Sequence, residues 1–262
     1  MEPAIVTTQL TRAFGEHLAV DRLDLEVEAG LFFGFLGPNG AGKSTTIKML
    51  TGLLDPSSGS ASILGHDVVR DHVEAKRCIG VVPEDLALFD RLTAPEYLTF
   101  VGRMYGLAPA DIGSRSDELL EWMDLHEQGR KLIVDYSHGM KKKLALAAAL
   151  IHRPRVLFLD EPFEGIDAVA SRQVRDLLGS LQQGGVTIFL TSHILEIVER
   201  LCSHVAVIDG GRLVAQGSLD ELRRGIASDD AGEQAAGRPL EELFLSLVGK
   251  DDTPKSSLSW LQ

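Results

Sequence analysis

The chain has 262 residues, of which 44% are hydrophobic, and its formal net charge is −12. This length and apolar fraction suit one large domain with a sizeable core. The acidity argues against general affinity for nucleic acid and against electrostatic docking on anionic lipid, because both require a basic surface.

The N-terminal half of the sequence predicts β structure over residues 5–30, where Leu23, Leu25 and Val27 alternate with acidic residues as in a half-exposed strand. Apolar runs without such alternation are typical of strands buried on both faces of a parallel sheet. These runs are Phe32–Leu36, Cys78–Val82, Val156–Asp160 and Thr187–Thr191. A hairpin is expected around Gly210-Gly211, between Val205–Asp209 and Arg212–Gln216.

Residues 83–136 have a different character, because apolar residues recur there at helical spacing in Ala94–Tyr105 and Ser116–Leu125. We therefore expect a helical subdomain at about residues 85–150, inserted into a core that ends near residue 225. An acidic tail over residues 226–262 should carry one amphipathic helix at Leu240–Val248 and be flexible elsewhere.

Two further features indicate where the protein resides. Cys78 and Cys202 lie far apart without metal-ligand spacing, which favours two reduced thiols. No signal peptide is visible, and no stretch approaches the ~20 apolar residues that a membrane span needs. We expect a cytoplasmic chain without direct membrane insertion.

The most informative motif is Gly37–Thr45, which matches the phosphate-binding pattern G-x-x-x-x-G-K-[ST] without a mismatch. An apolar run leads into it and a helix-like run leaves it. In that setting, backbone N–H groups and the helix N-terminus converge on phosphate oxygens. The candidate nucleotide-binding residues are Gly37, Pro38, Asn39, Gly40, Ala41, Gly42, Lys43, Ser44 and Thr45. Lys43 would reach the β and γ phosphates, and the Ser44 hydroxyl would help to hold Mg²⁺.

A second phosphate-site element is the carboxylate pair at the end of the run Val156–Asp160. An Asp at such a strand end anchors Mg²⁺ in phosphate-loop enzymes, and this role suits Asp160. Glu161 can face the γ phosphate and orient an attacking water. His193, just past another apolar strand, could hydrogen-bond the γ phosphate, although a histidine at a strand end is more often structural.

Together these elements resemble the ATPase subunit of an ATP-binding cassette (ABC) transporter over about residues 4–225. The segment that decides the resemblance is Tyr136–Met140, followed by Lys141–Ile151, which looks like the family's signature motif and lies upstream of Asp160. The resemblance implies an α/β fold: a P-loop NTPase core with a parallel sheet, an antiparallel β subdomain and an inserted helical subdomain. It also implies ATP and Mg²⁺ as cofactors.

Several residue roles follow from the resemblance. Phe14 matches the aromatic residue that stacks on adenine, with a core aromatic in the first strand as the alternative. Asp160 matches the metal anchor, Glu161 the catalytic carboxylate and His193 the switch histidine. Asp167 matches the acidic residue of a loop that crosses to a second subunit.

Ser137 and Gly139 match signature positions that close over the γ phosphate of the opposite subunit's ATP. Independently of the family, Ser137 is expected to cap a helix that begins near Gly139, and the free N–H groups of that helix suit an anion. This helix start should lie too far from its own phosphate loop to reach that loop's ligand. We interpret lysines 141–143 as a solvated basic face.

The chain departs from the family pattern at Glu84, where a Gln is usual. Its carboxylate could still meet Mg²⁺ or the attacking water, and its charge could slow hydrolysis. His138 and Met140 replace a Gly and a Gln of the signature. These variants, like the pattern Leu240–Phe244, are similar to the exporter branch whose ATPase and permease are separate chains.

The resemblance therefore implies a second ATPase subunit, which is either an identical copy or a close relative. It also implies a separate transmembrane permease that holds the chain at the inner face of the membrane. The alternatives are a soluble ABC-type ATPase without a transport role and a regulatory nucleotide binder. A small-molecule kinase lacks support, because no acceptor site is evident.

Overall fold

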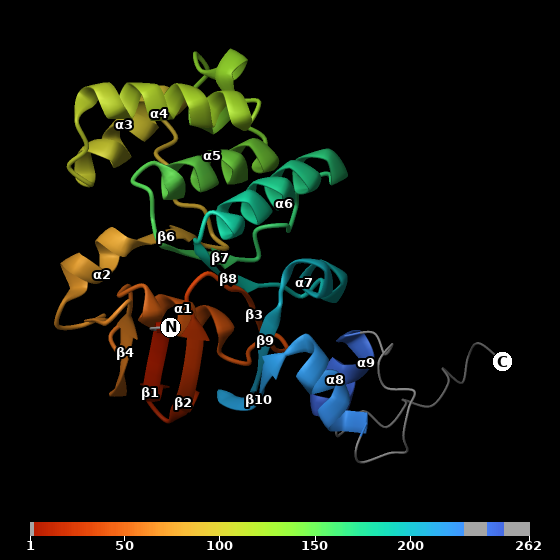
Figure 1. The fold of residues 1–262 in the computed structure, drawn as a ribbon. Helices are drawn as coiled ribbons and strands as arrows, with labels where there is room; N and C mark the ends of the chain where they lie inside the picture. The colour runs from red at the N-terminus through yellow and green to blue at the C-terminus, as the bar shows by residue number, and fades with distance from the viewer. Residues whose placement is uncertain (1–2, 228–239, 249–262) are drawn as a thin grey trace, which may run out of the picture.

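The computed structural model describes residues 3–227 and 240–248, and a six-stranded sheet forms its centre (Figure 1). The strand order is β10-β9-β3-β8-β7-β6. The strands are β3 (Phe32–Leu36), β6 (Ile79–Val82), β7 (Val156–Asp160), β8 (Thr187–Thr191), β9 (His204–Asp209) and β10 (Arg212–Ser218). All pairs are parallel except β9 and β10, which form the predicted hairpin. Every residue of β3, β7 and β8 is buried, which accounts for their continuous apolar composition.

A second, antiparallel sheet has the order β2-β1-β4-β5. Its strands are β1 (Pro3–Phe14), β2 (His17–Glu28), β4 (Ser58–Ile63) and β5 (His66–Asp67). Leu23, Leu25 and Val27 of β2 are buried, as their alternation predicts. Helix α1 (Lys43–Leu50) packs between the two sheets, and Ile47 of α1 shares one core with residues of both. This core fixes the phosphate segment in space, because α1 begins directly after it.

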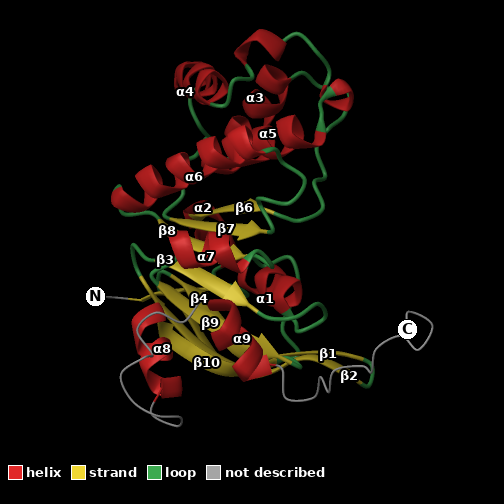
Figure 2. Ribbon diagram, turned by 90° about the vertical axis from the view of Figure 1, so that its right-hand side faces the viewer, coloured by secondary structure: helices red, strands yellow, loops and turns green. Residues whose placement is uncertain are grey.

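The other face of the central sheet is covered by α5 (His138–Leu150), α6 (Ala168–Gln183) and α7 (Leu195–Leu201). Helix α5 is buried along most of its length, since it lies between the sheet and the helical subdomain. Figure 2 shows α3 (Ala94–Met104) and α4 (Pro109–Trp122) beyond α5, on its far side from the sheet. One-turn helices at His126–Gln128 and Ile133–Asp135 complete this subdomain.

Several element boundaries differ from the sequence-based expectation, including the end of β10, which lies at Ser218 instead of Gln216. Helix α4 starts at Pro109 rather than at Ser116, because a proline in the first turn lacks only an N–H that would be unpaired there. It ends at Trp122 rather than at Leu125. Strand β6 begins at Ile79, because Cys78 is the last residue of helix α2 (His72–Cys78).

The C-terminal part of the described chain contains α8 (Leu219–Ala227) and α9 (Leu240–Val248). Leu240 and Leu243 of α9 are buried against the core, and α9 contacts α7, α8 and β9. The expected flexibility of the acidic tail concerns residues that lie mostly outside those described. The division near residue 225 stays a prediction. Among the described residues, none of the helices combines the length and apolar character required to cross a bilayer.

Candidate functional site

The phosphate-loop motif forms the turn between β3 and α1, as its flanks predict. Gly42, the N-cap of α1, has φ 105°, which favours glycine, and a Cβ there would lie 2.5 Å from the Ala19 carbonyl oxygen. Lys43 is 8% exposed, and its Nζ donates hydrogen bonds to the carbonyl oxygens of Gly37 (2.7 Å) and Pro38 (3.1 Å). The Lys43 side chain therefore folds back over the phosphate loop and stabilises it.

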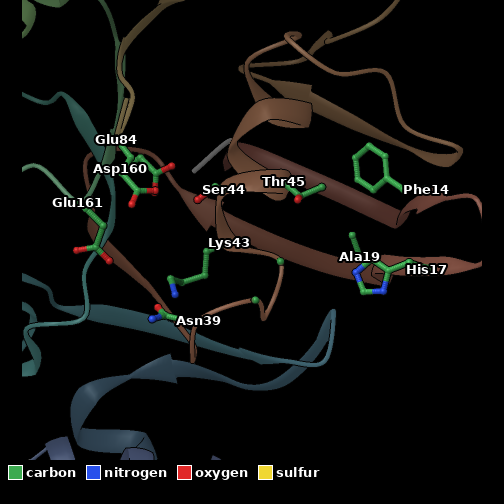
Figure 3. Close-up of a pocket in the computed structure, with 12 residues that line it drawn as sticks. Phe14, His17, Ala19, Asn39, Lys43, Ser44, Thr45, Glu84, Asp160 and Glu161 are labelled. Atoms are coloured by element: carbon green, nitrogen blue, oxygen red, sulfur yellow. The ribbon is translucent and has the colours of Figure 1, made fainter. Parts of the chain in front are cut away.

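A cavity of about 440 Å³ lies over this turn (Figure 3), a volume usual for small-molecule sites. The lining residues are Phe14, His17, Ala19, Asn39, Gly40, Gly42, Lys43, Ser44, Thr45, Glu84, Asp160 and Glu161. Figure 3 shows Phe14 and His17 at one end of the cavity and the three carboxylates at the other, with Lys43 and Ser44 between them. The site thus offers an aromatic end, a cationic loop and an acidic end to an elongated ligand.

Phe14 is the last residue of β1 and is 47% exposed, so it is not a core aromatic. The Arg12 guanidinium lies 4.6 Å from the centre of its ring. A cation over one ring face holds an aromatic side chain by its quadrupole. Phe14 therefore lines the cavity with its ring held by Arg12, and its expected stacking on adenine stays a prediction.

The buried carboxylates are held from strand β8. The Thr191 hydroxyl donates a hydrogen bond to Asp160 Oδ1 (2.5 Å) and accepts one from the Glu161 backbone N–H (3.1 Å). Glu161 follows the last residue of β7 and has φ 49°, a left-handed conformation uncommon outside glycine. Such strain persists where surrounding contacts impose it, and it occurs often at functional sites.

His193 meets Glu161 directly. Its backbone N–H (3.2 Å) and its Nδ1 (2.9 Å) both contact Glu161 Oε2. The imidazole is 55% exposed and does not line the cavity. In this structure His193 therefore orients the Glu161 carboxylate, while its expected contact with a γ phosphate stays a prediction.

Glu84 lines the acidic end together with Asp160 and Glu161. Although Glu84 is exposed, partial desolvation at the cavity raises the pKa of its carboxyl, and the negative charge of Asp160 raises it further. A Gln at this position would have no such charge. Glu84 therefore makes the acidic end more negative than the family's usual residue would.

Ser137, Gly139 and Asp167 lie outside this cavity. Ser137 is exposed and caps α5, accepting a hydrogen bond from the Met140 N–H (3.2 Å) as expected. Asp167 is also exposed and caps α6 through the N–H groups of Val169 and Ala170, both at 2.9 Å. The backbone hydrogen bonds at this cap lower the pKa of Asp167, beginning with the bond from Ala170.

The family profile described as ABC transporter matches residues 20–164, more than half of the chain. The chain belongs to the ABC transporter family. It is 41% identical to a daunorubicin resistance ATP-binding protein of Streptomyces coeruleorubidus, over 87% of this chain and 72% of the relative. It is 39% identical to a bacitracin transport ATP-binding protein of Bacillus licheniformis, over 86% and 72% respectively.

Among solved structures, an ATP-binding subunit of an ABC transporter superposes with a TM-score of 0.86 at 30% identity. The superposition covers 93% of this chain and 99% of the solved chain. The expected P-loop NTPase fold and the expected ATPase activity of a transporter subunit are thereby confirmed. The alternative functions without transport are not favoured.

This ABC ATPase also contains site residues that the sequence analysis missed. His17 and Ala19 line the cavity, because the turn after Phe14 folds β2 back beside the phosphate loop. The only sequence signal for His17 was its place three residues after Phe14. Thr191 was noted only as part of a strand end, although its hydroxyl connects both carboxylates.

The interpretation of lysines 141–143 as a solvated face is wrong for Lys142. This residue is 5% exposed, and its Nζ donates a hydrogen bond of 2.6 Å to the Glu161 carbonyl oxygen. Burial lowers the pKa of Lys142, whereas the carboxylates around it, foremost Glu164, oppose that shift. Lys141 forms a more open ion pair with Asp90 at 3.1 Å. The interpretation also fails for Lys143, whose side chain is 13% exposed and donates hydrogen bonds to the Met123 carbonyl oxygen (3.0 Å) and to Gln173 Oε1 (2.7 Å).

Proposed function

We propose that this chain hydrolyses MgATP in the cavity over the phosphate loop, as one half of a two-subunit sandwich that drives export through a separate permease. One observation carries the proposal: the phosphate loop with its Lys43 and the buried carboxylates Asp160 and Glu161 line the same cavity. An anion-binding turn opposite a buried general base is the arrangement that phosphoanhydride hydrolysis requires.

The residues present fit a magnesium ion. Ser44, Glu84 and Asp160 all line the cavity and offer only oxygen ligands, which Mg²⁺ prefers. Within the described residues, no group of three acidic, histidine or cysteine side chains could hold a metal unaided, so phosphate oxygens would complete the coordination. When bound, the ion would neutralise charge on the transferring phosphoryl group.

The protein's own residues would divide the remaining work. Phe14 stacks on the base, and the residues from Gly37 to Thr45 bind the phosphates through backbone N–H groups and Lys43 Nζ. Glu161 orients the attacking water and accepts its proton. His193, already bonded to Glu161 Oε2, fixes the direction of that carboxylate.

The second subunit would complete the site. Ser137, Gly139 and Asp167 lie outside their own chain's cavity, and Ser137 and Asp167 are exposed at helix N-termini. A helix N-terminus with unpaired N–H groups attracts phosphate. We therefore assign Ser137 and Gly139 to the neighbouring subunit's γ phosphate, and Asp167 to the contact between subunits. ATP favours the closed pair because only that state satisfies its γ phosphate fully.

The helical subdomain would meet the permease. Phe89 and Phe100 are 51% and 42% exposed, and their rings pack edge to face with centroids 5.1 Å apart. The ring centroid of Tyr97 lies 6.0 Å from that of Phe89, and Met104 is 72% exposed. An exposed aromatic cluster of this kind is typical of a protein interface.

The permease would hold the chain at the inner face of the membrane. The drug-resistance and antibiotic-transport names of its relatives favour export.

The substitution Glu161→Gln tests the proposal. It keeps the side chain's size but removes the base, so phosphate release by the purified full chain with Mg²⁺ and ATP should fall at least 100-fold, the lower end of general-base contributions of ~10²–10⁴. ATP should then convert the variant to a long-lived dimer in size-exclusion chromatography. Exposed Glu118→Gln is the control and should behave as wild type. Wild-type turnover by Glu161→Gln would refute the catalytic assignment.

A further inference from the structure

Lys142 is a buried cation that the reaction described above does not use. It lies on α5, five residues after Ser137, and its side chain reaches across to the end of β7. There its ammonium group donates a hydrogen bond of 2.6 Å to the backbone carbonyl oxygen of Glu161. Burying a lysine is unfavourable unless specific partners compensate, so this contact needs an explanation.

The bond acts on a peptide group with an unusual conformation. Glu161 has φ 49°, and each of its polar groups has a partner. Its N–H donates to the Thr191 hydroxyl, and its carboxylate meets His193. Its carbonyl oxygen accepts a bond of 2.6 Å from Lys142 and a longer one, 3.3 Å, from the Glu164 N–H. Fixing the carbonyl fixes the peptide plane on the C-terminal side of Glu161. Together, these contacts hold both the backbone and the carboxylate of Glu161, with Lys142 giving the shortest bond to the carbonyl oxygen.

The charge of Lys142 has a second effect. The carboxylates of Glu164, Glu161, Glu84 and Asp160 all act on its ammonium group, in that order of strength. Like charges at one site repel each other, and the repulsion is strong where water is scarce. The ammonium group offsets this repulsion without occupying the cavity, since Lys142 is not among the lining residues.

The first turn of α5 is also packed on the loop that follows Glu161. A Cβ at Gly165 (φ 68°) would lie 2.8 Å from the His138 ring, and one at Gly139 would lie 3.7 Å from Ile166. These contacts are short-range and largely non-polar. The Lys142 bond adds a directional, charge-assisted link between this helix and the catalytic glutamate.

We propose that Lys142 is a positioning residue, which holds Glu161 in its hydrolytic orientation and ties the helix that carries Ser137 and Gly139 to the catalytic end of its own subunit. This inference rests on the proposed function, because it takes Glu161 as the base. Loss of the link would slow the chemical step and leave ground-state nucleotide binding nearly unchanged.

The test compares Lys142→Met, which removes both the charge and the donor, with Lys142→Arg, which keeps both. Lys141→Met is the matched control, because it is the same substitution one residue earlier on α5. For each full-length variant, kcat and KM for MgATP are measured by phosphate release. Melting temperature and the stoichiometry of a fluorescent ATP analogue are also measured.

We expect Lys142→Met to lower kcat per binding site at least tenfold with KM within about threefold, Lys142→Arg to recover most of kcat, and Lys141→Met to match wild type. A merely structural lysine would lower the melting temperature but leave kcat per binding site at the wild-type value, and that result would overturn the inference. If Lys142→Met does not fold, Lys142→Gln replaces it. A kcat for Lys142→Gln equal to that of Lys142→Arg would likewise overturn it.

The two proposals fail in different ways. Absence of ATP hydrolysis by the wild-type chain would refute the proposed function, and normal hydrolysis by Glu161→Gln would refute the assignment of Glu161 as its base. An inactive Glu161→Gln variant together with a fully active Lys142→Met variant would leave the function intact and refute only the role of Lys142.

Discussion

The hydroxyl of Thr191 offers a quantitative test of how the carboxylates are held. Thr191 is fully buried, donates to Asp160 Oδ1 at 2.5 Å and accepts from the Glu161 N–H at 3.1 Å. The substitution Thr191→Val replaces the hydroxyl by a methyl group of similar size. It therefore leaves a buried N–H and a buried carboxylate oxygen without their partner.

An orphaned buried N–H costs about 1–3 kcal/mol, and a lost hydrogen bond to a charged group about 1.5–3 kcal/mol. The free energy of unfolding should therefore fall by roughly 3–5 kcal/mol. At about 2–4 °C per kcal/mol for a domain of this size, the melting temperature should fall by roughly 10 °C. Turnover should fall as well, because Asp160 and Glu161 lose their common anchor.

Thr187→Val is the matched control on the same strand. Thr187 is equally buried, but its hydroxyl accepts one hydrogen bond, from the Gly30 N–H at 2.9 Å, and it lies at the other end of β8. Thr187→Val should lower the free energy of unfolding by about 1–2 kcal/mol and leave turnover per folded molecule unchanged. Thermal melts followed by circular dichroism, with phosphate-release assays, measure both effects. Equal stability losses for the two variants, with wild-type turnover in both, would refute the reasoning.

Two further predictions concern the phosphate loop and Glu84. Lys43→Ala should weaken binding of a fluorescent ATP analogue at least tenfold, about 1.4 kcal/mol, whereas Lys48→Ala on the exposed side of α1 should not; equal affinities would contradict the loop assignment. Since the pKa of Glu84 is raised above 4.5 in the folded protein, its contribution to stability is present at low pH and is lost as the pH rises through the folded-state pKa. The free energy of unfolding of Glu84→Gln should therefore exceed that of wild type at neutral pH, so the variant should melt slightly higher. The difference should be less than about 1 kcal/mol, because the side chain is exposed. Melts across a pH series should show this difference shrinking below about pH 4.5, and a constant difference would rule out the titration of Glu84 as its cause.

Much of the fold could be predicted because its elements have local signals. The runs Phe32–Leu36, Val156–Asp160 and Thr187–Thr191 are strands with the predicted limits, since a strand buried on both faces needs an unbroken apolar sequence. Helix α9 likewise has its predicted bounds. Strand β4 (Ser58–Ile63) has no such signal, because it is rich in small polar residues and its first half is exposed. Pairing with β1 determines its conformation.

The site divides in the same way. The sequence alone determined the phosphate loop and the carboxylates at a strand end, because residue type and spacing along one stretch of chain dictate that chemistry. Only the tertiary structure decided the burial of Lys142 against Glu161, the hydroxyl bridge from Thr191 and the place of His17 in the cavity. Each of these features depends on how a helix or strand distant in sequence packs against the site. The sequence of three consecutive lysines does not show which of them the fold buries.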